Sequence, residues 1–171
     1  MADDPDRRKF LKLATCGVGA GLGAAIGLPT LSMVIDPAGR QTVTTPKEPI
    51  DIGDPGHIGA EWQRVDVVAP MIRDAWVSAQ NVVLGAAWLR KRDKLEAVSA
   101  VCPHLGCAVG WQPEKKTFLC ACHNSVFADN GDPTSGPAKR GLDPLPIEVK
   151  DGRLRLTWVR YKLDTKSREP A

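Results

Sequence analysis

Two short boxes of cysteine and histidine constrain this chain more than any other feature. They read Cys102-Pro-His104-Leu-Gly-Cys107 and Cys120-Ala-Cys122-His123-Asn-Ser125. In each box a cysteine and a histidine lie one or two residues apart, so that one tight loop can aim two ligands at a metal. The chain has five cysteines and three histidines, and only Cys16 and His57 lie outside the boxes. Metal or disulfide chemistry is therefore confined to one short stretch.

Each box offers one thiolate and one imidazole. Two thiolates on one iron and two imidazoles on the other are the ligand set of the Rieske type of [2Fe–2S] centre, in which neutral histidines raise the reduction potential. A tetrahedral zinc site built from four cysteines is the alternative. It would use Cys102, Cys107, Cys120 and Cys122, but the Cys-x₄-Cys and Cys-x-Cys spacings suit zinc less well and the histidines would have no role. With Cys–His pairs as ligands, two cysteines are left over, and a disulfide is permitted beyond the membrane.

The N-terminus is a separate unit. A basic segment, residues 1–12, precedes an uncharged stretch of 23 residues from Leu13 to Ile35. At 1.5 Å per residue this stretch spans roughly 35 Å, enough to cross a membrane. The basic flank should remain cytoplasmic, which places the rest of the chain outside. Asp6 to Lys12 resembles a twin-arginine export signal. We expect an uncleaved anchor because no small-x-small site follows; a removed signal is the alternative.

The remaining chain divides by composition into three parts. Residues 36–60 are rich in proline and glycine and predict a hinge or linker. Residues 61–161 contain short β-like segments, and residues 162–171 form a polar tail that we expect to be frayed. The expected strands are Val65–Ala69, Val77–Gln80, Val82–Arg90, Leu95–Val101, Thr117–Ala121, Pro146–Val149 and Arg153–Val159. Charged tips at 91–94 and at 150–152, the latter with Asp-Gly, predict hairpins.

Composition supports an ordinary globular domain. About 43% of the residues are hydrophobic and 25% are charged, and no helix of convincing period follows residue 60. The formal charge of +3 is too small to indicate a nucleic-acid partner. Many short strands separated by turn residues predict an antiparallel sandwich.

The boxes, the anchor and the hinge together resemble a Rieske iron–sulfur subunit of a quinol-oxidising cytochrome bc-type complex, over essentially the whole chain. The resemblance implies an all-β Rieske domain of antiparallel sheets over 61–161, with one [2Fe–2S] cluster held by two loops and one N-terminal transmembrane helix. It implies these roles: Cys102 and Cys120 bind the inner iron, His104 and His123 bind the outer iron, Cys107 pairs with Cys122, Ser125 donates to a bridging sulfide, and His123 contacts the quinol.

Three further positions bear on the resemblance. The segment Gly136-Pro137-Ala138 resembles the proline loop that covers the cluster on a third side. Asn124 stands where many relatives have glycine, and asparagine tolerates positive φ better than most residues. Phe127 stands where high-potential relatives carry a tyrosine that donates to a cysteine sulfur. Since hydrogen bonds to sulfur stabilise the reduced cluster, we expect a lower potential here.

The resemblance implies a subunit that takes one electron, with a proton, from quinol and passes it to a cytochrome c-type haem. Its partners would be cytochrome b-type and cytochrome c-type subunits in a dimeric complex of the cytoplasmic membrane, with the cluster domain on the periplasmic side. The alternative is the small Rieske subunit of a molybdenum oxidase such as arsenite oxidase. An oxygenase would need a mononuclear iron on two histidines and a carboxylate, and only His57 is spare.

Overall fold

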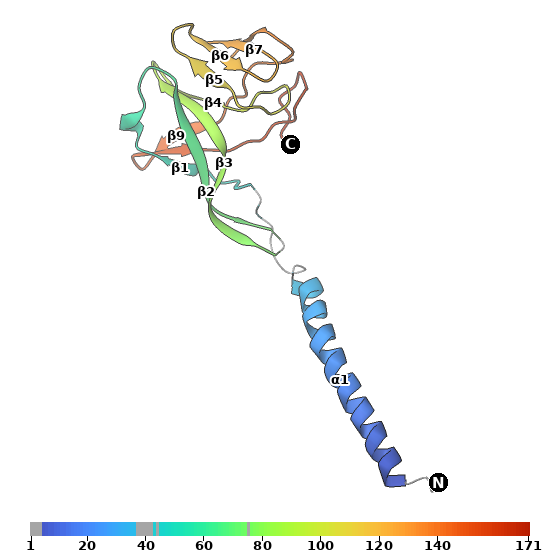
Figure 1. The fold of residues 1–171 in the computed structure, drawn as a ribbon. Helices are drawn as coiled ribbons and strands as arrows, with labels where there is room; N and C mark the ends of the chain where they lie inside the picture. Colours follow the sequence, from blue (N-terminus) through green and yellow to red (C-terminus); the bar gives the residue numbers. More distant parts are fainter. Residues whose placement is uncertain (1–4, 37–42, 44, 75) are drawn as a thin grey trace. The chain divides into compact units, whose positions relative to one another are not determined.

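One long helix forms most of the N-terminal unit. The computed structural model of the chain describes residues 5–36, 43, 45–74 and 76–171. Helix α1 (Pro5–Ile35) has 31 residues (Figure 1) and is about 46 Å long at 1.5 Å per residue. It begins at a proline and carries Asp6 in its first turn, both favourable at a helix N-terminus. Residues 1–4, 37–42 and 44, parts of the predicted cytoplasmic segment and linker, lie outside the described residues.

Within the described part of the chain, α1 alone has the length and apolarity of a membrane-spanning helix, from Asp6 to Ile35. Its large apolar side chains, such as Leu13 and Ile26, are exposed. This agrees with the predicted membrane anchor. The orientation of the anchor and the export role of the twin arginines stay predictions.

Three small sheets form the folded unit that carries both boxes. Their strand orders are β1-β10-β9, β2-β3-β4 and β5-β6-β7-β8. This confirms the predicted all-β class with antiparallel sheets. The strands are β1 (Ile50–Gly53), β2 (Gln63–Arg73), β3 (Ser78–Lys91), β4 (Leu95–Ser99), β5 (Gly110–Gln112), β6 (Thr117–Cys120), β7 (Ser125–Ala128), β8 (Pro133–Ser135), β9 (Ile147–Lys150) and β10 (Arg153–Leu156).

Both predicted hairpins are present. Lys91 of β3 pairs with Leu95 of β4, so the charged residues 92–94 form the tip. Lys150 of β9 pairs with Arg153 of β10, and the two residues between them, Asp151 and Gly152, have φ values of 53° and 71°. Positive φ at both positions is what a two-residue hairpin turn requires, which explains the Asp-Gly pair.

Several strands differ from the prediction. Strand β1 lies inside the segment that we expected to be linker, because Ile50 pairs with Leu156 of β10 and is only 4% exposed. The segments Val77–Gln80 and Val82–Arg90, expected as two strands, belong to the single strand β3. Strands β5, β7 and β8 have three or four residues each and were not predicted.

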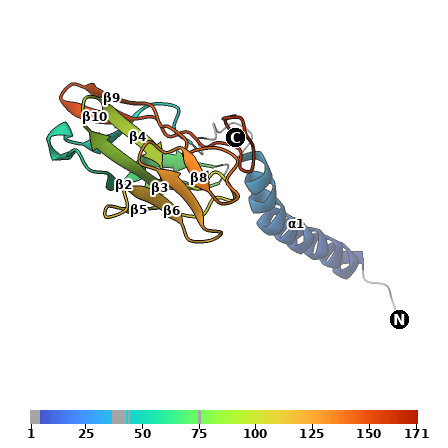
Figure 2. The ribbon, with the colours of Figure 1, turned by 90° about the horizontal axis from the view of Figure 1, so that it is seen from above.

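Two hydrophobic clusters hold the sheets together. The first packs β2, β3 and β4 against β1 and β10 and includes Val67, Leu89 and Leu156, all fully buried. The second lies beneath the two boxes, where the Phe118 ring centre is 4.7 Å from that of Trp111 and 5.3 Å from that of Trp62. In both ribbon views β4 lies between the β9–β10 hairpin and the β5–β6 hairpin (Figure 2). It thereby contributes to both clusters through Ala97 and Val98.

A polar junction joins the box-bearing sheet to the neighbouring hairpin. The Arg90 side chain, 7% exposed, lies 4.3 Å above the ring of Trp62 and forms ion pairs with Glu96 and Asp129. Asp129 follows β7 directly and also accepts from Arg92 at 2.9 Å. Burial alone would raise the pKa of Asp129, but the hydrogen bonds from the two arginines outweigh burial and lower it. The junction therefore keeps its charges at neutral pH.

The C-terminal tail is packed, and the expectation of a frayed tail is wrong. Lys162 N donates to Glu169 O and Ala171 N donates to Arg160 O, both at 2.8 Å. The buried Arg140 guanidinium forms hydrogen bonds with the tail. It donates to both carboxylate oxygens of Asp143, to the carbonyl and hydroxyl of Thr165, and to Lys162 O, at 2.8–2.9 Å. The tail is ordered by these backbone hydrogen bonds and by its contacts with the buried Arg140, none of which can be inferred from its polar composition.

We predict that Arg140→Leu destabilises the folded unit by about 3 kcal/mol, because it leaves the buried Asp143 carboxylate with only its 3.5 Å contact to Arg168. Denaturant unfolding of the full-length protein in detergent measures this loss. Arg153→Leu is the matched control, since it breaks an exposed pair with Asp51 and should change stability little. Equal losses in the two variants would contradict the prediction.

Candidate metal centre

The first box forms a tight loop between β4 and β5. Cys102 N donates to Cys107 O at 2.7 Å and Gly106 N donates to Cys102 O at 2.9 Å, so the loop closes on itself. Val101 and Ala108 form an isolated bridge at its base. Cys102 is 1% exposed, whereas Leu105 at the tip is 57% exposed. The loop thus turns its thiol inward and its tip outward.

The second box is the turn of the β6–β7 hairpin. Cys120 pairs with Ser125, and residues 121–124 form the turn between them. Asn124 has a φ of 55°, as expected of an asparagine standing where relatives have glycine. Cys120 and Ser125 are buried, at 2% and 0% exposed, while His123 at the turn is exposed.

The structure brings all four candidate ligands together and sorts them by exposure. The imidazole rings of His104 and His123 have centres 4.9 Å apart and lie nearly perpendicular, at 84°. The thiols of Cys102 and Cys120 are both buried and belong to the same hydrophobic cluster. Burial raises the pKa of the Cys102 thiol, and donation from the backbone N–H groups of His104 and Leu105 opposes this rise. The two thiols are buried, His104 is half-buried and His123 is exposed, so these four side chains can hold a metal group near the surface of the domain.

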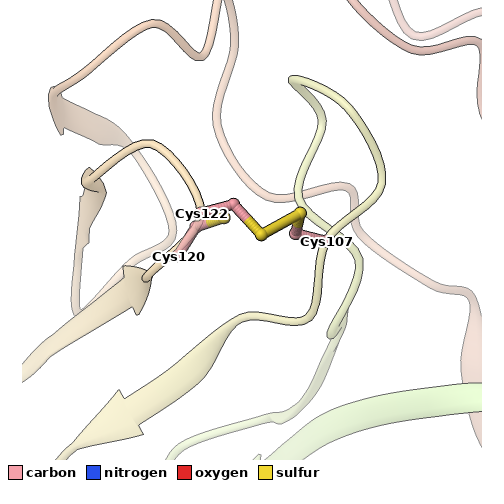
Figure 3. A group of neighbouring side chains, drawn as sticks. All are labelled: Cys107, Cys120 and Cys122. Carbon is pink, nitrogen blue, oxygen red and sulfur yellow. A yellow bond between two sulfur atoms is a disulfide. The ribbon is translucent and has the colours of Figure 1, made fainter.

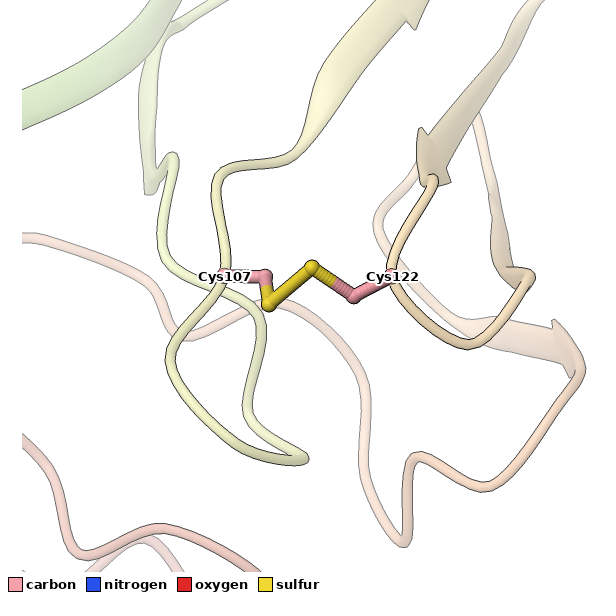
Figure 4. The surroundings of a disulfide bond; sticks show 2 residues. All are labelled: Cys107 and Cys122. Carbon is pink, nitrogen blue, oxygen red and sulfur yellow. A yellow bond between two sulfur atoms is a disulfide. The ribbon is translucent and has the colours of Figure 1, made fainter.

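A disulfide ties the two loops together. Cys107 and Cys122 are bonded, with their Cα atoms 6.6 Å apart, and the bond crosses from one loop to the other (Figure 4). The sulfurs of Cys107, Cys120 and Cys122 lie within 4.8 Å of one another (Figure 3). Two of the three are oxidised, so they cannot act as thiolate ligands. The four-cysteine zinc alternative loses half of its donors for this reason.

A third segment packs against the second loop at Gly136. This glycine has a φ of 90°, and a Cβ atom there would lie 2.5 Å from Ser125 Cα and 2.7 Å from Asn124 O. Ala138 packs against the hydrophobic cluster that contains the buried cysteines. Gly136 therefore lies against the second box, and the covering of the centre by Gly136-Pro137-Ala138 stays a prediction.

The buried hydroxyl of Ser125 tests whether the site fits an iron–sulfur cluster. Its Oγ is fully buried and finds no hydrogen-bond partner within the described part of the chain. Buried polar groups are normally hydrogen-bonded, and a sulfide between two buried thiolates and two imidazoles would accept this donor. The four donors and the orphaned hydroxyl therefore fit a [2Fe–2S] group of the Rieske type.

Sequence reasoning missed the residues that hold the loops from outside. Lys139 and Asp164 form an ion pair at 2.8 Å, and Asp164 N donates to Pro103 O at 2.9 Å. Neither residue lies in a box, and no spacing links them. Leu105 lies within the first box, and its side chain is exposed to solvent. The sequence does not show that this apolar side chain is at the surface.

Comparison with known proteins agrees with this geometry. Residues 62–146 match the family described as Rieske [2Fe-2S] domain. The menaquinol:cytochrome c reductase iron-sulfur subunit of Geobacillus thermodenitrificans is 35% identical, over 88% of this chain and 89% of that protein. The subunit of the same name from Bacillus subtilis is 32% identical, over 93% and 95%. The cytochrome b6-f complex iron-sulfur subunit of Nostoc punctiforme is 29% identical, over 96% and 92%.

Fold, site and sequence similarity define a Rieske-type iron–sulfur protein, whose cofactor is a [2Fe–2S] cluster. The similarity extends beyond the domain through nearly the whole of the relatives. The chain belongs to the family of Rieske iron–sulfur subunits of cytochrome bc-type complexes.

We predict that Gly136→Ala lowers the cluster content of the purified protein, because the added Cβ pushes the second loop away at Ser125. Iron analysis and the electron paramagnetic resonance (EPR) spectrum measure this content. Gly152→Ala is the matched control: it also has positive φ, at 71°, but nothing lies within 4 Å of an added Cβ. It should carry only the backbone strain of about 1 kcal/mol and keep its cluster. Full cluster content in Gly136→Ala would refute the packing argument.

We predict that Phe127→Tyr raises the reduction potential of the cluster and that Ser125→Ala lowers it. Phe127 is fully buried in the same hydrophobic cluster as Cys102 and Cys120, and the first prediction requires that the tyrosine hydroxyl reach the sulfur of Cys102. Each donor aimed at sulfur favours the reduced state. Rieske centres span roughly −150 to +300 mV, and protein-film voltammetry resolves shifts within that range. A lower or unchanged potential in Phe127→Tyr would contradict the donor argument.

Proposed function

We propose that this chain is the electron-transfer subunit of a quinol:cytochrome c oxidoreductase. Cys102 and Cys120 would hold the inner iron, His104 and His123 the outer iron, and Ser125 would donate to a bridging sulfide. The single observation that carries the proposal is the arrangement of these donors: two buried thiols and two adjoining imidazoles, of which His104 is half-buried and His123 is exposed. When bound, the cluster supplies a one-electron acceptor with a histidine-raised potential.

His123 is the residue that we propose to contact the quinol. It is exposed at the turn of the β6–β7 hairpin, so its ring nitrogen that is not bound to iron can accept a hydrogen bond from a quinol hydroxyl. The same nitrogen can take up the quinol proton as the electron leaves the quinol. Leu105, 57% exposed on the adjoining loop, provides an apolar surface beside the two imidazoles for the quinol ring or for the subunit that binds it.

Menaquinol is the donor that we propose first. Two relatives that cover most of this chain are menaquinol:cytochrome c reductase subunits. Phe127 supports the same choice, because it lacks the hydroxyl that would raise the potential by donating to sulfur. A centre of lower potential accepts electrons only from a more strongly reducing quinol.

The proposed partners follow from the anchor and the relatives. Helix α1 would cross the cytoplasmic membrane with its basic end inside, which places the cluster domain on the outer side, where the disulfide is stable. A cytochrome b-type subunit would present the quinol, and a cytochrome c-type subunit would accept the electron, within a dimeric complex.

We predict that the complex purified from membranes with this chain oxidises a menaquinol analogue and reduces cytochrome c. Leu105→Ala should keep the Rieske EPR spectrum and lower turnover about fivefold, the effect of losing roughly 1 kcal/mol of contact. Cys120→Ser should lose both spectrum and turnover, because it removes a ligand. Val149→Ala, a similarly exposed apolar residue on β9, is the matched control and should behave like the wild type.

Mass spectrometry of the purified complex decides between the candidate functions. A cytochrome b-type subunit supports the proposal. A molybdenum protein in its place would favour the small subunit of a molybdenum oxidase and would contradict the proposal. An intact Rieske spectrum in Cys120→Ser would overturn the ligand assignment.

A further inference from the structure

The C-terminal segment from Tyr161 to Ala171, which we call the strap, lies against the cluster loops. Its ends are brought together by an isolated bridge between Tyr161 and Pro170. Inside the strap, Lys162 pairs with Glu169 at 3.0 Å. The strap is therefore an ordered loop of the folded unit. Its residues 163–165 contact the first box and the segment that follows Gly136.

The strap contacts the first cluster loop next to a ligand. Asp164 N donates to Pro103 O at 2.9 Å, and Pro103 lies between the proposed ligands Cys102 and His104. A Cβ atom at Gly106 would lie 3.2 Å from Leu163 Cδ1, so the strap side chain also covers the far end of this loop. Asp164 adopts a φ of 55°, the conformation that turns its N–H toward the loop and that aspartate tolerates.

The strap also contacts the segment that follows Gly136. Lys139 donates to the Asp164 carboxylate at 2.8 Å and to its carbonyl at 3.1 Å. One position further, the buried Arg140 donates to the Thr165 carbonyl and hydroxyl, both at 2.8 Å. Asp164 thus contacts both the first box, at Pro103, and the segment that follows Gly136, at Lys139.

Asp164 lies next to the proposed ligand His104 in the fold, because its N–H donates to the carbonyl of Pro103, the residue that precedes His104. The hydrogen bond from Lys139 is the main cause that lowers the pKa of Asp164, and the positive charge of Lys139 adds to it. Lys139 and Asp164 are both about half exposed, at 46% and 47%. Solvent therefore weakens the effect that a change of charge at either position has on the electrostatic potential at the site, and added salt should weaken it further.

We propose that Asp164 is a positioning residue for the outer ligand His104: its backbone holds the Cys102–His104 loop, and its carboxylate, compensated by Lys139, contributes to the electrostatic potential at that ligand. The proposal rests on the ligand assignment of the proposed function. It goes beyond that function because it makes the C-terminal strap part of the redox site, although the strap contains no candidate ligand.

The test compares charge variants by voltammetry of the full-length protein in detergent. Asp164→Asn removes the negative charge and keeps a residue that tolerates positive φ, so it should raise the midpoint potential. Lys139→Met should lower it, and the double variant should return toward the wild type. We expect about a twofold change in the reduction equilibrium in each single variant, which is about 18 mV for one electron. The shifts should shrink at high ionic strength.

The matched control is Asp51→Asn, which removes an aspartate of similar ion pairing, to Arg153, on β1. It should leave the potential unchanged, whereas a shift equal to that of Asp164→Asn would overturn the proposal. Shifts of the same sign in Asp164→Asn and Lys139→Met, or none, with a normal Rieske spectrum, would overturn this proposal alone. A wild-type protein without a Rieske spectrum would overturn the ligand assignment and this proposal with it.

Discussion

The register of the β6–β7 hairpin is the constraint on which the site depends. Phe118 lies opposite Phe127 and Cys120 opposite Ser125, and all four side chains face inward. A shift of one residue would turn this whole set outward, because alternate residues of a strand face opposite sides. The same register leaves a four-residue turn that must present Cys122 and His123 at the surface. The disulfide from Cys122 and the packing of Gly136 on Ser125 both depend on the position of this turn.

The two boxes could be identified from the sequence because the side chains that define each box are close together in the chain. Each needs only a loop, a thiol and an imidazole within four residues, and the Asp151-Gly152 turn is local in the same sense. Strand β1 and the strap could not be predicted in this way. Ile50 becomes a strand residue only by pairing with Leu156, more than a hundred positions away, and Asp164 gains its role only through Pro103 and Lys139. Such contacts leave no periodic signal in the segments that make them.

Two buried arginines outside the ligand boxes hold neighbouring segments in place. Arg90 fastens the end of β7 to the β3–β4 hairpin through Asp129, and Arg140 fastens the strap through Thr165. Both guanidiniums are buried and bonded to carboxylates. Planar, always-charged guanidinium suits such positions because it donates in several fixed directions at once. The sequence does not show which arginines are buried, so Arg90 and Arg140 could be told apart from surface arginines only in the structure.

The sorting of thiols and imidazoles by exposure also restricts the route of the electron. Behind Cys102 and Cys120 lie Phe118 and Phe127, fully buried, and the sheet that carries them. On the opposite side of the two cysteines, His123 is exposed and His104 is half-buried. With the proposed ligands, a molecule that exchanges electrons with the cluster would therefore approach most closely from the side of the two histidines, because the aromatic side chains fill the space behind the cysteines.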